Sequence, residues 1–367
     1  MEIIHLILGK ANPERMNGVN KVVSQLATHQ QRQGRDVAVW GITNDLSRNF
    51  EERVFETLLF PASKNPFGVH SLLRNAIRNK AGSNVVFHLH GGWIPVYTTL
   101  SGLFQKLHIR FVITGHGAYN TIAMNRSKWL KKAYFRLFEK TLLKRACKIH
   151  SIGQSEVEGL SLIYQNDKNV LLPYGFQLQK AAFPVIPNPD SFTIGFVGRL
   201  TSWTKGLDLL IHAFQEFHKM EPQSTLWIVG DGPDRSDLEN LITKNKVRNV
   251  VFYGSKFGSE KDELISQMHV FAHPSRNEGL PASVLEAAGL GIPVIVSKAT
   301  NVAQSVSRYK AGTALVNNSA EDLTKAFTEF RNADRDTMKQ ISKNAARMVS
   351  EEFGWDRLID KFDEMYH

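Results

Sequence analysis

The sequence predicts an α/β protein with two doubly wound parallel-sheet domains, and three observations lead to this prediction. Short β-branched and apolar runs alternate with longer amphipathic segments, as in repeated βαβ units. The alternation stops once, at residues 183–191, where three prolines interrupt the chain, and then starts again. The length of 367 residues and the apolar content of 42% allow two hydrophobic cores, although one large domain remains possible.

The first half opens with a strand-like run, and a helix is expected next over residues 18–33. We place the first domain at residues 1–183. Its predicted strands are IIHLIL (3–8), VAVWGI (37–42), NVVFHLH (84–90), RFVITG (110–115), KIHSIG (148–153) and NVLLP (169–173).

The second half repeats this pattern, and we place the second domain at residues 184–353. Residues 319–348 are predicted to be helical, and an amphipathic helix over 354–367 is expected to pack back on the first domain. The predicted strands are FTIGFVG (192–198), STLWIVG (224–230), NVVFYG (249–254), VFAHPS (270–275) and PVIVS (293–297).

The net charge of +10 is concentrated in the first half of the chain. Residues 1–185 hold 24 Lys and Arg against 11 Asp and Glu, whereas the remainder holds 21 against 24. A basic surface favours polyanions, so nucleic acid, anionic lipid and phosphorylated substrates all stay open. The single cysteine, Cys147, excludes an intrachain disulfide, and the start MEIIHLILGK lacks the features of a signal peptide. We therefore expect a cytoplasmic protein, and no apolar run approaches the roughly 20 residues that span a bilayer.

Two basic residues follow the first predicted strand of the second half. Ligands of open α/β sheets bind beyond the carboxyl ends of the strands, and the cleft between two such domains is the natural site. Arg199 would lie at the strand end and Lys205 at the start of the next helix, where free N–H groups already favour an anion. The pair suits a diphosphate. The alternative is two solvated loop cations.

Two carboxylates stand in the apolar segment PSRNEGLPASVLEAAGLG, residues 274–291. A short, largely apolar helix is predicted at about 281–290, which places Glu278 in the loop before it and Glu286 inside it. A buried carboxylate needs partners, and sugar hydroxyls are donors that it can accept from. The pair could therefore grip hydroxyls on two parts of one ligand. The alternative is a structural salt bridge or cap.

Four segments in this order resemble the C-terminal half of a known family. They are GRLTSWTKGLDLLIHAF (198–214), IVGDGPDRSDLE (228–239), FYGS (252–255) and FAHPSRNEGLPASVLEAAGLGIPVIVS (271–297). Together they resemble the retaining glycosyltransferases of GT-B fold and family four, glycosyl transferases group 1, over most of residues 192–315. The resemblance implies a GT-B fold in which two Rossmann-like doubly wound domains face an interdomain cleft.

The resemblance also implies roles for residues of the second half. Arg199 and Lys205 would hold the donor diphosphate, and Glu286 would accept from the ribose hydroxyls. Glu278, with Gly279 and Leu280 beside it, would contact the transferred sugar, although relatives often have a Phe-Gly pair after this glutamate. The backbone from Phe252 to Ser255, including Gly254, resembles the part that cradles the nucleotide base.

In the first half, residues 14–40 resemble the family's glycine-containing loop and first helix. Asn17 stands where relatives often have a second glycine. Gly18 permits a close approach of the backbone to a donor phosphate, and a plain turn glycine is the alternative.

The segments HLHGGW (88–93) and ITGHGAYN (113–120) each place His and Gly at the end of a predicted strand. In the family such a histidine holds the donor hexose, and His116 is the better match for this catalytic position. His88, His90 and Trp93 are then expected to line the acceptor side. A structural histidine is the alternative for each.

Residues 126–148 carry nine cations and one acid together with apolar side chains at near-helical spacing. Such a basic amphipathic helix can lie on an anionic membrane surface, which would place the protein peripherally on the inner face of the membrane. The alternative is a helix that is buried on one face and solvated on the other.

The favoured function is transfer of a hexose or N-acetylhexosamine from a nucleoside diphosphate sugar to a hydroxyl acceptor, with a lipid-linked glycan of bacterial surface polysaccharide as the expected acceptor. We expect no Asp-x-Asp metal motif, so no metal or other cofactor is expected and Arg199 and Lys205 would neutralise the leaving diphosphate. Alternatives are a sugar-nucleotide epimerase or hydrolase of the same fold, or a non-catalytic polyanion-binding protein. A dehydrogenase is disfavoured because the first βα turn lacks G-x-G-x-x-G, and no nucleic-acid recognition motif is found.

Overall fold

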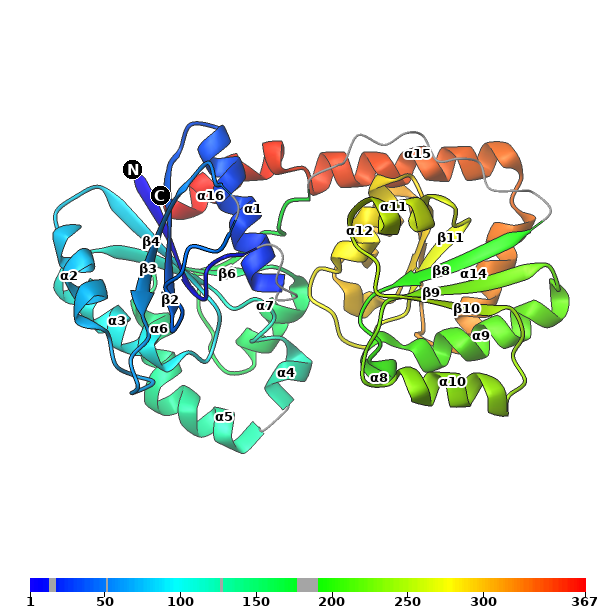
Figure 1. Cartoon of the computed structure of the whole chain (residues 1–367), viewed down its shortest axis with the longest axis horizontal. Helices are drawn as coiled ribbons and strands as arrows, with labels where there is room; N and C mark the ends of the chain where they lie inside the picture. The colour runs from blue at the N-terminus through cyan, green and yellow to red at the C-terminus, as the bar shows by residue number, and fades with distance from the viewer. Residues whose placement is uncertain (13–17, 51, 126–127, 177–190) are drawn as a thin grey trace. The chain divides into compact units, whose positions relative to one another are not determined.

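The computed structural model describes the chain except for residues 13–17, 51, 126–127 and 177–190. The described chain forms two compact units, one of residues Met1–Gly175 with Trp355–His367 and one of Phe176–Gly354 (Figure 1). The predicted domain boundary at residue 183, most of the proline-containing segment, and Asn17 lie outside the described residues.

The first unit is built on a seven-stranded parallel sheet. The strand order is β3-β2-β1-β4-β5-β6-β7, which is a doubly wound arrangement that reverses direction at β1. Its central strands are buried on both faces, so they are almost wholly apolar except for histidines. The strands are β1 (Glu2–Leu8), β2 (Asp36–Thr43), β3 (Glu56–Pro61), β4 (Val85–His90), β5 (Arg110–Thr114), β6 (Lys148–Ser151) and β7 (Asn169–Leu171).

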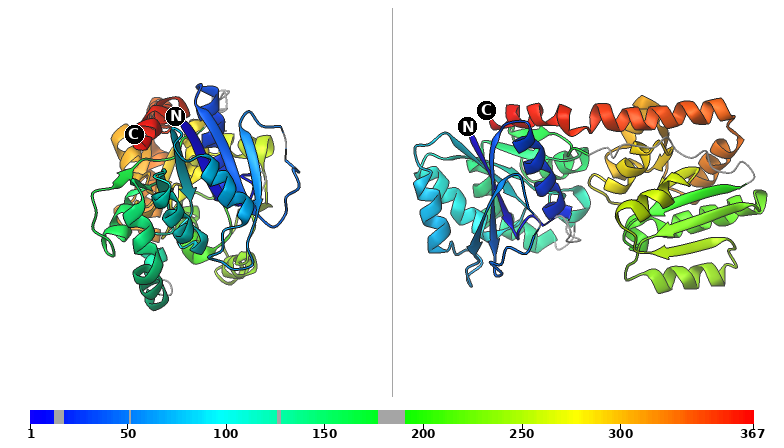
Figure 2. Two further views of the ribbon diagram at one scale, coloured as in Figure 1. Left: turned by 90° about the vertical axis from the view of Figure 1, so that its left-hand side faces the viewer. Right: turned by 45° about the horizontal axis from the view of Figure 1, so that its top comes forward.

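Helices cover both faces of this sheet, as the two turned views of Figure 2 show. The last helix, α16 (Trp355–Tyr366), belongs to the first unit and packs beside α1. Arg35 fixes it through ion pairs with Asp360 and Asp363, each at 2.7 Å. The other helices are α1 (Gly18–Arg32), α2 (Ser71–Asn79), α3 (Pro95–Lys106), α4 (Thr121–Asn125), α5 (Lys128–Tyr134), the π-helix η1 (Phe135–Glu139), α6 (Lys140–Arg145) and α7 (Gln154–Ser161).

The second unit is built on a six-stranded parallel sheet of order β10-β9-β8-β11-β12-β13. The order again reverses at a central strand, and β8 and β11 lie side by side at that point. The loops that follow these two strands therefore start from neighbouring strand ends. The strands are β8 (Phe192–Val197), β9 (Ser224–Val229), β10 (Val250–Gly254), β11 (Val270–His273), β12 (Val294–Val296) and β13 (Gly312–Ala314).

Two hydrophobic clusters fill the space between this sheet and its helices. The amphipathic helix α9 supplies Leu210, Phe214 and Phe217 to the first cluster, while α12 supplies Val284 and Leu285 to the second. The helices are α8 (Ser202–Lys205), α9 (Leu207–Met220), α10 (Arg235–Lys244), α11 (Gly258–Ser266), α12 (Ala282–Gly289), the 3-10 helix η2 (Lys298–Thr300), α13 (Ala303–Tyr309), α14 (Ala320–Asn332) and α15 (Arg335–Glu352).

Every strand that the sequence predicted is present, and β3 and β13 are additional. The predicted helix over 319–348 is two helices, because the Asp334 side chain accepts a hydrogen bond from the backbone N–H of Thr337 at 2.7 Å and so caps a new helix, α15. The predicted helix over 126–148 contains the π-helix η1 in its middle, and residue 148 already belongs to β6. Among the described residues, no helix is long and apolar enough to cross a bilayer.

Candidate active site

The loop after β8 carries the two predicted basic residues. Arg199 is exposed and makes no ion pair with another described residue. Lys205 ends the one-turn helix α8, and only Gly206 separates it from α9, whose first turn is the positive end of the helix dipole. The region therefore carries two cations and the free N–H groups of a helix start, which together favour an anionic ligand.

Gly206 brings this loop against the loop that follows β11. It joins α8 to α9 with a left-handed φ of 67°, and a Cβ added to it would lie 2.0 Å from the carbonyl oxygen of Pro274. Only glycine fits both the conformation and the space. Next to this contact, the Ser275 hydroxyl donates to the Thr204 carbonyl at 2.7 Å, and Arg276 binds both carboxylate oxygens of Asp208 at 2.8 and 2.7 Å. The two loops thus form one rigid layer.

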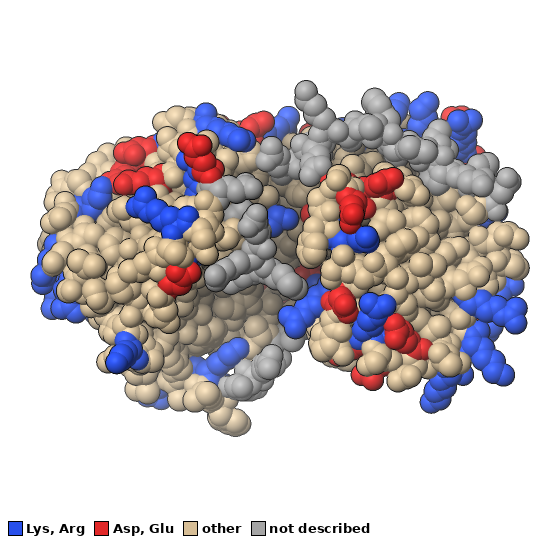
Figure 3. Space-filling model, in the orientation of Figure 1, with Lys and Arg blue, Asp and Glu red and all other residues tan. Residues whose placement is uncertain are grey.

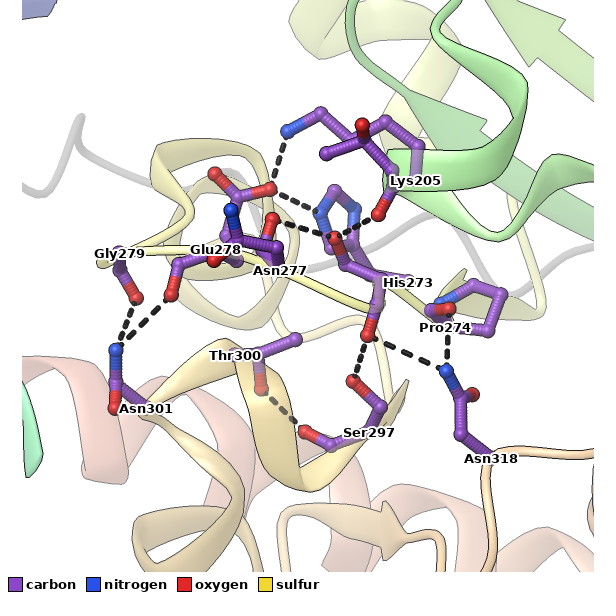
Figure 4. Close-up of polar contacts among 12 residues, drawn as sticks. Lys205, His273, Pro274, Asn277, Glu278, Gly279, Ser297, Thr300, Asn301 and Asn318 are labelled. Carbon is purple, nitrogen blue, oxygen red and sulfur yellow. Dashed lines mark hydrogen bonds and ion pairs between the residues drawn. The ribbon is translucent and has the colours of Figure 1, made fainter. Parts of the chain in front are cut away.

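Glu278 lies where these loops meet, and Lys205 and His273 bind it (Figure 4). Lys205 forms an ion pair with Oε2 of Glu278, and the Nε2 atom of His273 lies 3.3 Å from the same oxygen. The Lys205 and Glu278 side chains are each 18% exposed, whereas His273 is buried and stacks on Phe196 with the ring centroids 5.3 Å apart. We call these three residues the Glu278 cluster.

The Glu278 cluster keeps its carboxylate ionised. Burial alone would raise the pKa of Glu278, but the hydrogen bond from His273 and the charge of Lys205 outweigh burial and lower this pKa to about 2. Burial lowers the pKa of His273, so its ring is neutral near pH 7 and donates from Nε2. At neutral pH, Glu278 is therefore a pure hydrogen-bond acceptor.

The backbone of the Glu278 loop is also held in place. The side-chain amide of Asn301 donates to the carbonyl oxygens of Glu278 at 3.1 Å and of Gly279 at 2.9 Å (Figure 4). Leu280 packs at the edge of the hydrophobic cluster that contains α12. Gly279 and Leu280 thus position the loop, and Glu278 supplies its charged group.

Glu286 lies inside α12, as the sequence predicted for this carboxylate. Its Oε1 atom lies 2.7 Å from the ammonium group of Lys261 on α11, and the side chains are 11% and 15% exposed. This ion pair is the alternative that the sequence left open. Each of the two glutamates is therefore paired with a lysine, one from the loop after β8 and one from the helix before β11.

Phe252 and Gly254 lie on the edge strand β10. Phe252 is half-buried against the core, with the guanidinium carbon of Arg235 5.5 Å from its ring centroid. Gly254 has a left-handed φ of 67°, and its carbonyl oxygen accepts a hydrogen bond from the backbone N–H of Gly230 at 2.8 Å. This bond connects the ends of β9 and β10.

In the first unit, Gly18 is the exposed first residue of α1, and a Cβ added to it would meet no atom within 4 Å. The space around Gly18 therefore does not require glycine within the described chain. The loop just before it lies outside the described residues.

His116 and Trp93 follow β5 and β4, and both adopt left-handed backbone conformations, with φ of 54° and 61°. The next residue after His116, Gly117, donates its N–H to the buried carboxylate of Glu156, which fixes the loop. The indole N–H of Trp93 donates to the Ala118 carbonyl at 3.0 Å, so its polar atom is already used. His116 is half-buried, and burial followed by the charge of His150 lowers its pKa to about 3.

The expectation that His88 and His90 line the acceptor side needs correction. Their side chains are 0% and 1% exposed, and they lie inside the sheet core instead of at its edge. His88 binds the hydroxyl of Tyr366 at 2.8 Å and that of Thr114 at 2.6 Å, and Nε2 of His90 binds His5 at 2.9 Å. Strand alternation places both rings on one face, and that face is covered by α1 and α16.

Sequence reasoning missed several residues that shape these sites. His273 could have been found, because it ends a strand five residues before Glu278. No sequence signal marks Lys261, Asn301 or Glu156, because each reaches its partner from a separate element. One Asp-x-Asp sequence does occur, at residues 334–336, and its first carboxylate caps α15.

Two doubly wound sheets with charged side chains after their central strands are typical of nucleotide-binding proteins. Two family profiles match the chain: "Glycosyltransferase Family 4" over residues 16–180 and "Glycosyl transferases group 1" over residues 179–348. The chain therefore belongs to the family-four glycosyltransferases of GT-B fold and is a glycosyltransferase.

Curated relatives agree with this assignment. An uncharacterized glycosyltransferase of Haemophilus influenzae is 24% identical over 353 residues, which cover 94% of this chain and 95% of the relative. The O-antigen biosynthesis glycosyltransferase WclY of Escherichia coli is 37% identical over 108 residues, or 29% of each chain. Among solved structures, Anabaena HepE in complex with UDP and glucose is 17% identical and covers 99% of this chain and 98% of its own, with a TM-score of 0.72. That structural likeness supports the fold.

Proposed function

We propose that the chain transfers a hexose or N-acetylhexosamine from a nucleoside diphosphate sugar to a hydroxyl acceptor, with retention of configuration. Two features of the second unit support this function. Cations and a helix start suit the diphosphate, and ionised acceptors suit sugar hydroxyls. The solved structure of HepE with UDP and glucose, although distant, has the ligand chemistry that this proposal requires.

The Glu278 cluster is the observation that carries the proposal. A carboxylate held ionised beside a lysine places an acceptor for hydroxyls next to a donor for phosphate oxygens. In the proposed roles, Glu278 binds the transferred sugar, Glu286 binds the ribose, and His116 of the first unit contacts the transferred hexose. Phe252 and Gly254 belong to the strand whose backbone would hold the base.

Charge on the leaving diphosphate is proposed to be neutralised by Arg199, Lys205 and the start of α9, with no metal ion. Groups that are preorganised toward developing charge are the main source of catalysis in such a step. The leaving phosphate itself would accept the proton of the attacking hydroxyl as the acceptor oxygen forms its bond on the same face of the sugar. No protein nucleophile is required in this scheme.

The test begins with thermal shift of the purified chain against a panel of nucleoside diphosphate sugars, since a ligand that binds the folded state raises the melting temperature. Transfer from the stabilising donor is then measured for Glu278→Gln and Lys205→Ala. Each variant is expected to lose about 10²–10³-fold in kcat, the usual effect of removing one charge-stabilising group. Near-normal rates in both variants would refute the proposal.

Lys219→Ala and Glu216→Ala are matched controls, because this exposed pair on α9 carries the same charges without the cluster. Incubation of the donor without acceptor separates a transferase from an epimerase or hydrolase of the same fold. Rapid conversion of the donor alone would favour the latter enzymes. The anomeric configuration of the product, read from its proton NMR coupling, tests retention.

For the acceptor, we propose a lipid-linked glycan of bacterial surface polysaccharide and a peripheral position on the membrane. The name of WclY, which assigns it to O-antigen biosynthesis, favours this acceptor class. The segment α5-η1-α6 exposes Trp129, Leu130 and Leu137 at 80%, 73% and 67% beside exposed lysines and arginines. Elsewhere, on the face that Figure 3 shows, basic and acidic side chains are interspersed.

Flotation with vesicles tests the membrane part of this proposal. Binding to anionic vesicles is expected to exceed binding to neutral ones, since each basic residue near an anionic surface contributes about 1 kcal/mol. Trp129→Ala and Leu137→Ala should weaken it, whereas Leu162→Ala, which changes a similarly exposed leucine at the C-terminal end of α7, should not. Equal binding to both vesicle types would refute a role for the basic surface.

A further inference from the structure

Five histidines of the first unit lie in one buried polar seam that crosses the sheet. His5, His88, His90 and His150 are buried in strands β1, β4 and β6, and His116 follows β5. The parallel register places His5 beside His88 and Thr114 beside His150. Thr114, Gln30 of α1 and Tyr366 of α16 complete the seam.

The hydrogen bonds of the seam form one continuous series that begins at a backbone carbonyl, and the Tyr174 hydroxyl contacts its last ring, His116. Nε2 of His150 lies 2.6 Å from the carbonyl oxygen of Leu172, and its Nδ1 lies 2.7 Å from the Thr114 hydroxyl. That hydroxyl lies 2.6 Å from Nε2 of His88, whose Nδ1 lies 2.8 Å from the hydroxyl of Tyr366. Tyr366 therefore stands at the midpoint of the chain.

The second half of this series of hydrogen bonds continues from Tyr366 to His116. The amide nitrogen of Gln30 donates to the Tyr366 hydroxyl at 3.3 Å, and its Oε1 lies 2.6 Å from Nε2 of His5. Nδ1 of His5 lies 2.9 Å from Nε2 of His90, and Nδ1 of His90 lies 2.9 Å from Nε2 of His116. Each ring nitrogen between the two ends has one partner.

Donor and acceptor counting fixes the direction of every bond. A carbonyl only accepts, so His150 carries its proton on Nε2, and a neutral ring then accepts at Nδ1. A hydroxyl has one proton, so Thr114 donates to His150 and accepts from Nε2–H of His88. By the same rule, Tyr366 donates to His88 and accepts from Gln30, which accepts from Nε2–H of His5. His5 then accepts from Nε2–H of His90, and His90 accepts from Nε2–H of His116.

The rings are neutral near pH 7, as this counting requires. Burial lowers the pKa of His5 and of His150 to about 4, and it lowers those of His88 and His90 well below the ordinary value. His5, His88 and His90 also offer nitrogens within 4.8 Å of one another. An ion there would need lone pairs that these bonds use, so the seam and a metal site exclude each other.

We propose that Tyr366 is a positioning residue that fixes His116 in its Nε2–H tautomer through this chain of hydrogen bonds, so that Nδ1 is held as an acceptor. Both ring nitrogens of His116 lie 3.2 Å from the Tyr174 hydroxyl, and because Nε2 carries the proton in this chain of bonds, the hydroxyl can donate only to Nδ1. The consequence for the donor rests on the proposed function: a sugar hydroxyl that takes the place of the Tyr174 hydroxyl can donate to Nδ1, whereas a carboxylate at the same place is repelled.

Removal of the Tyr366 hydroxyl separates the series of hydrogen bonds into two parts, in which the histidine tautomers are expected to respond differently. His88, Thr114 and His150 remain anchored by Leu172 and keep their tautomers. Gln30 loses its fixed orientation, and a flipped amide that donates to His5 satisfies the reversed chain equally well. His116 then populates both tautomers in comparable amounts, and a donor that needs one of them binds about two-fold more weakly.

The test is nitrogen NMR of the full chain labelled in histidine, which distinguishes Nε2–H from Nδ1–H rings without reference to activity. In the wild type, all five rings are expected as Nε2–H, with assignments from single His→Gln variants. Tyr366→Phe and Gln30→Leu should each give mixed tautomers at His116 and leave His150 unchanged, which is the internal control. Because Gln30→Leu alters a different helix, failure of one variant to fold leaves the other.

An Nδ1–H or doubly protonated His116 in the wild type, or a pure Nε2–H His116 in both variants, would overturn the proposal. Loss of the N–H signals of His5 and His90 on addition of Zn²⁺ would overturn it in favour of a metal site. The donor Kd of Tyr366→Phe is measured separately. An unchanged Kd with mixed tautomers contradicts only the link to the donor and leaves the role of Tyr366 in the tautomer intact.

Discussion

The buried histidines predict a steep loss of stability of the first unit in mildly acidic solution. The pKa of each of the five is lower in the folded state than the value of 6.5 for a free side chain, with burial as the main cause. Such groups contribute stability that is fully present above pH 6.5. It is lost as pH falls toward 4, where His5 and His150 begin to protonate in the fold.

The magnitude follows from proton counting. At pH 5.5 an unfolded histidine binds about 0.9 proton, and because each of the five has a lowered pKa in the fold, unfolding takes up at most roughly four protons. Between pH 6.5 and 5.5 this lowers the free energy of unfolding by roughly 5 kcal/mol, a large part of a typical domain's 5–15 kcal/mol. Glu139 and Glu156, whose pKa burial raises, act in the opposite sense and offset up to about two protons.

The assay is urea unfolding at a series of pH values. Unfolding of the first unit is monitored by hydrogen exchange and mass spectrometry of peptides from β1 and β4. The slope of the free energy with pH gives the proton uptake, expected between about two and four. His150→Gln should reduce it by about one proton. His212→Gln, at an exposed position of α9 in the other unit, should not change it. An uptake below one proton between pH 5.5 and 6.5 would refute the reasoning.

Three further predictions concern the second unit. His273→Phe keeps the stacking on Phe196 but removes a donor to Glu278, so the pKa of Glu278 rises and the acid limb of the pH–kcat profile moves to higher pH. His273→Gln should leave the profile near that of the wild type. Equal profiles for the two variants would contradict a direct bond between His273 and Glu278. Both Gly206 and Gly258 have positive φ, but a Cβ would meet the Pro274 carbonyl only at Gly206. Gly258→Ala should therefore lower the free energy of unfolding, measured in urea, by about 1 kcal/mol, and Gly206→Ala should lower it by more. Similar losses in the two variants would disprove the steric argument. Transfer in excess chelator should equal that without it, and a rate restored only by a divalent ion would show a metal requirement.

Much of the fold could be predicted because its local signals agree with one another. Apolar runs of strand length, separated by amphipathic segments, correctly located eleven strands. The strand β13 was missed because three residues, Gly312–Ala314, carry too little pattern. The break between α14 and α15 was missed because a single capping carboxylate, Asp334, outweighs a continuous helical pattern there.

For the site residues, the element that carries each side chain was easier to predict from the sequence than the burial of that side chain. Lys205, Glu278 and Glu286 follow strands or sit in a short helix, and the structure has them there. His88 and His90 were expected at a surface because they stand near a strand end. Strand alternation indicates which face a side chain occupies, but it does not say whether a later helix covers that face.

The sequence by itself determined the two doubly wound units, the family, and the loops that carry the charged residues, because periodicity, glycine and proline act over a few neighbouring residues. Only the tertiary structure decided which charges meet. Lys261 reaches Glu286 from a different helix, and Tyr366 reaches His88 across 278 positions of the chain. These pairs arise from strand register and helix packing, in which residues far apart in sequence come within hydrogen-bond distance, and no local pattern encodes that proximity.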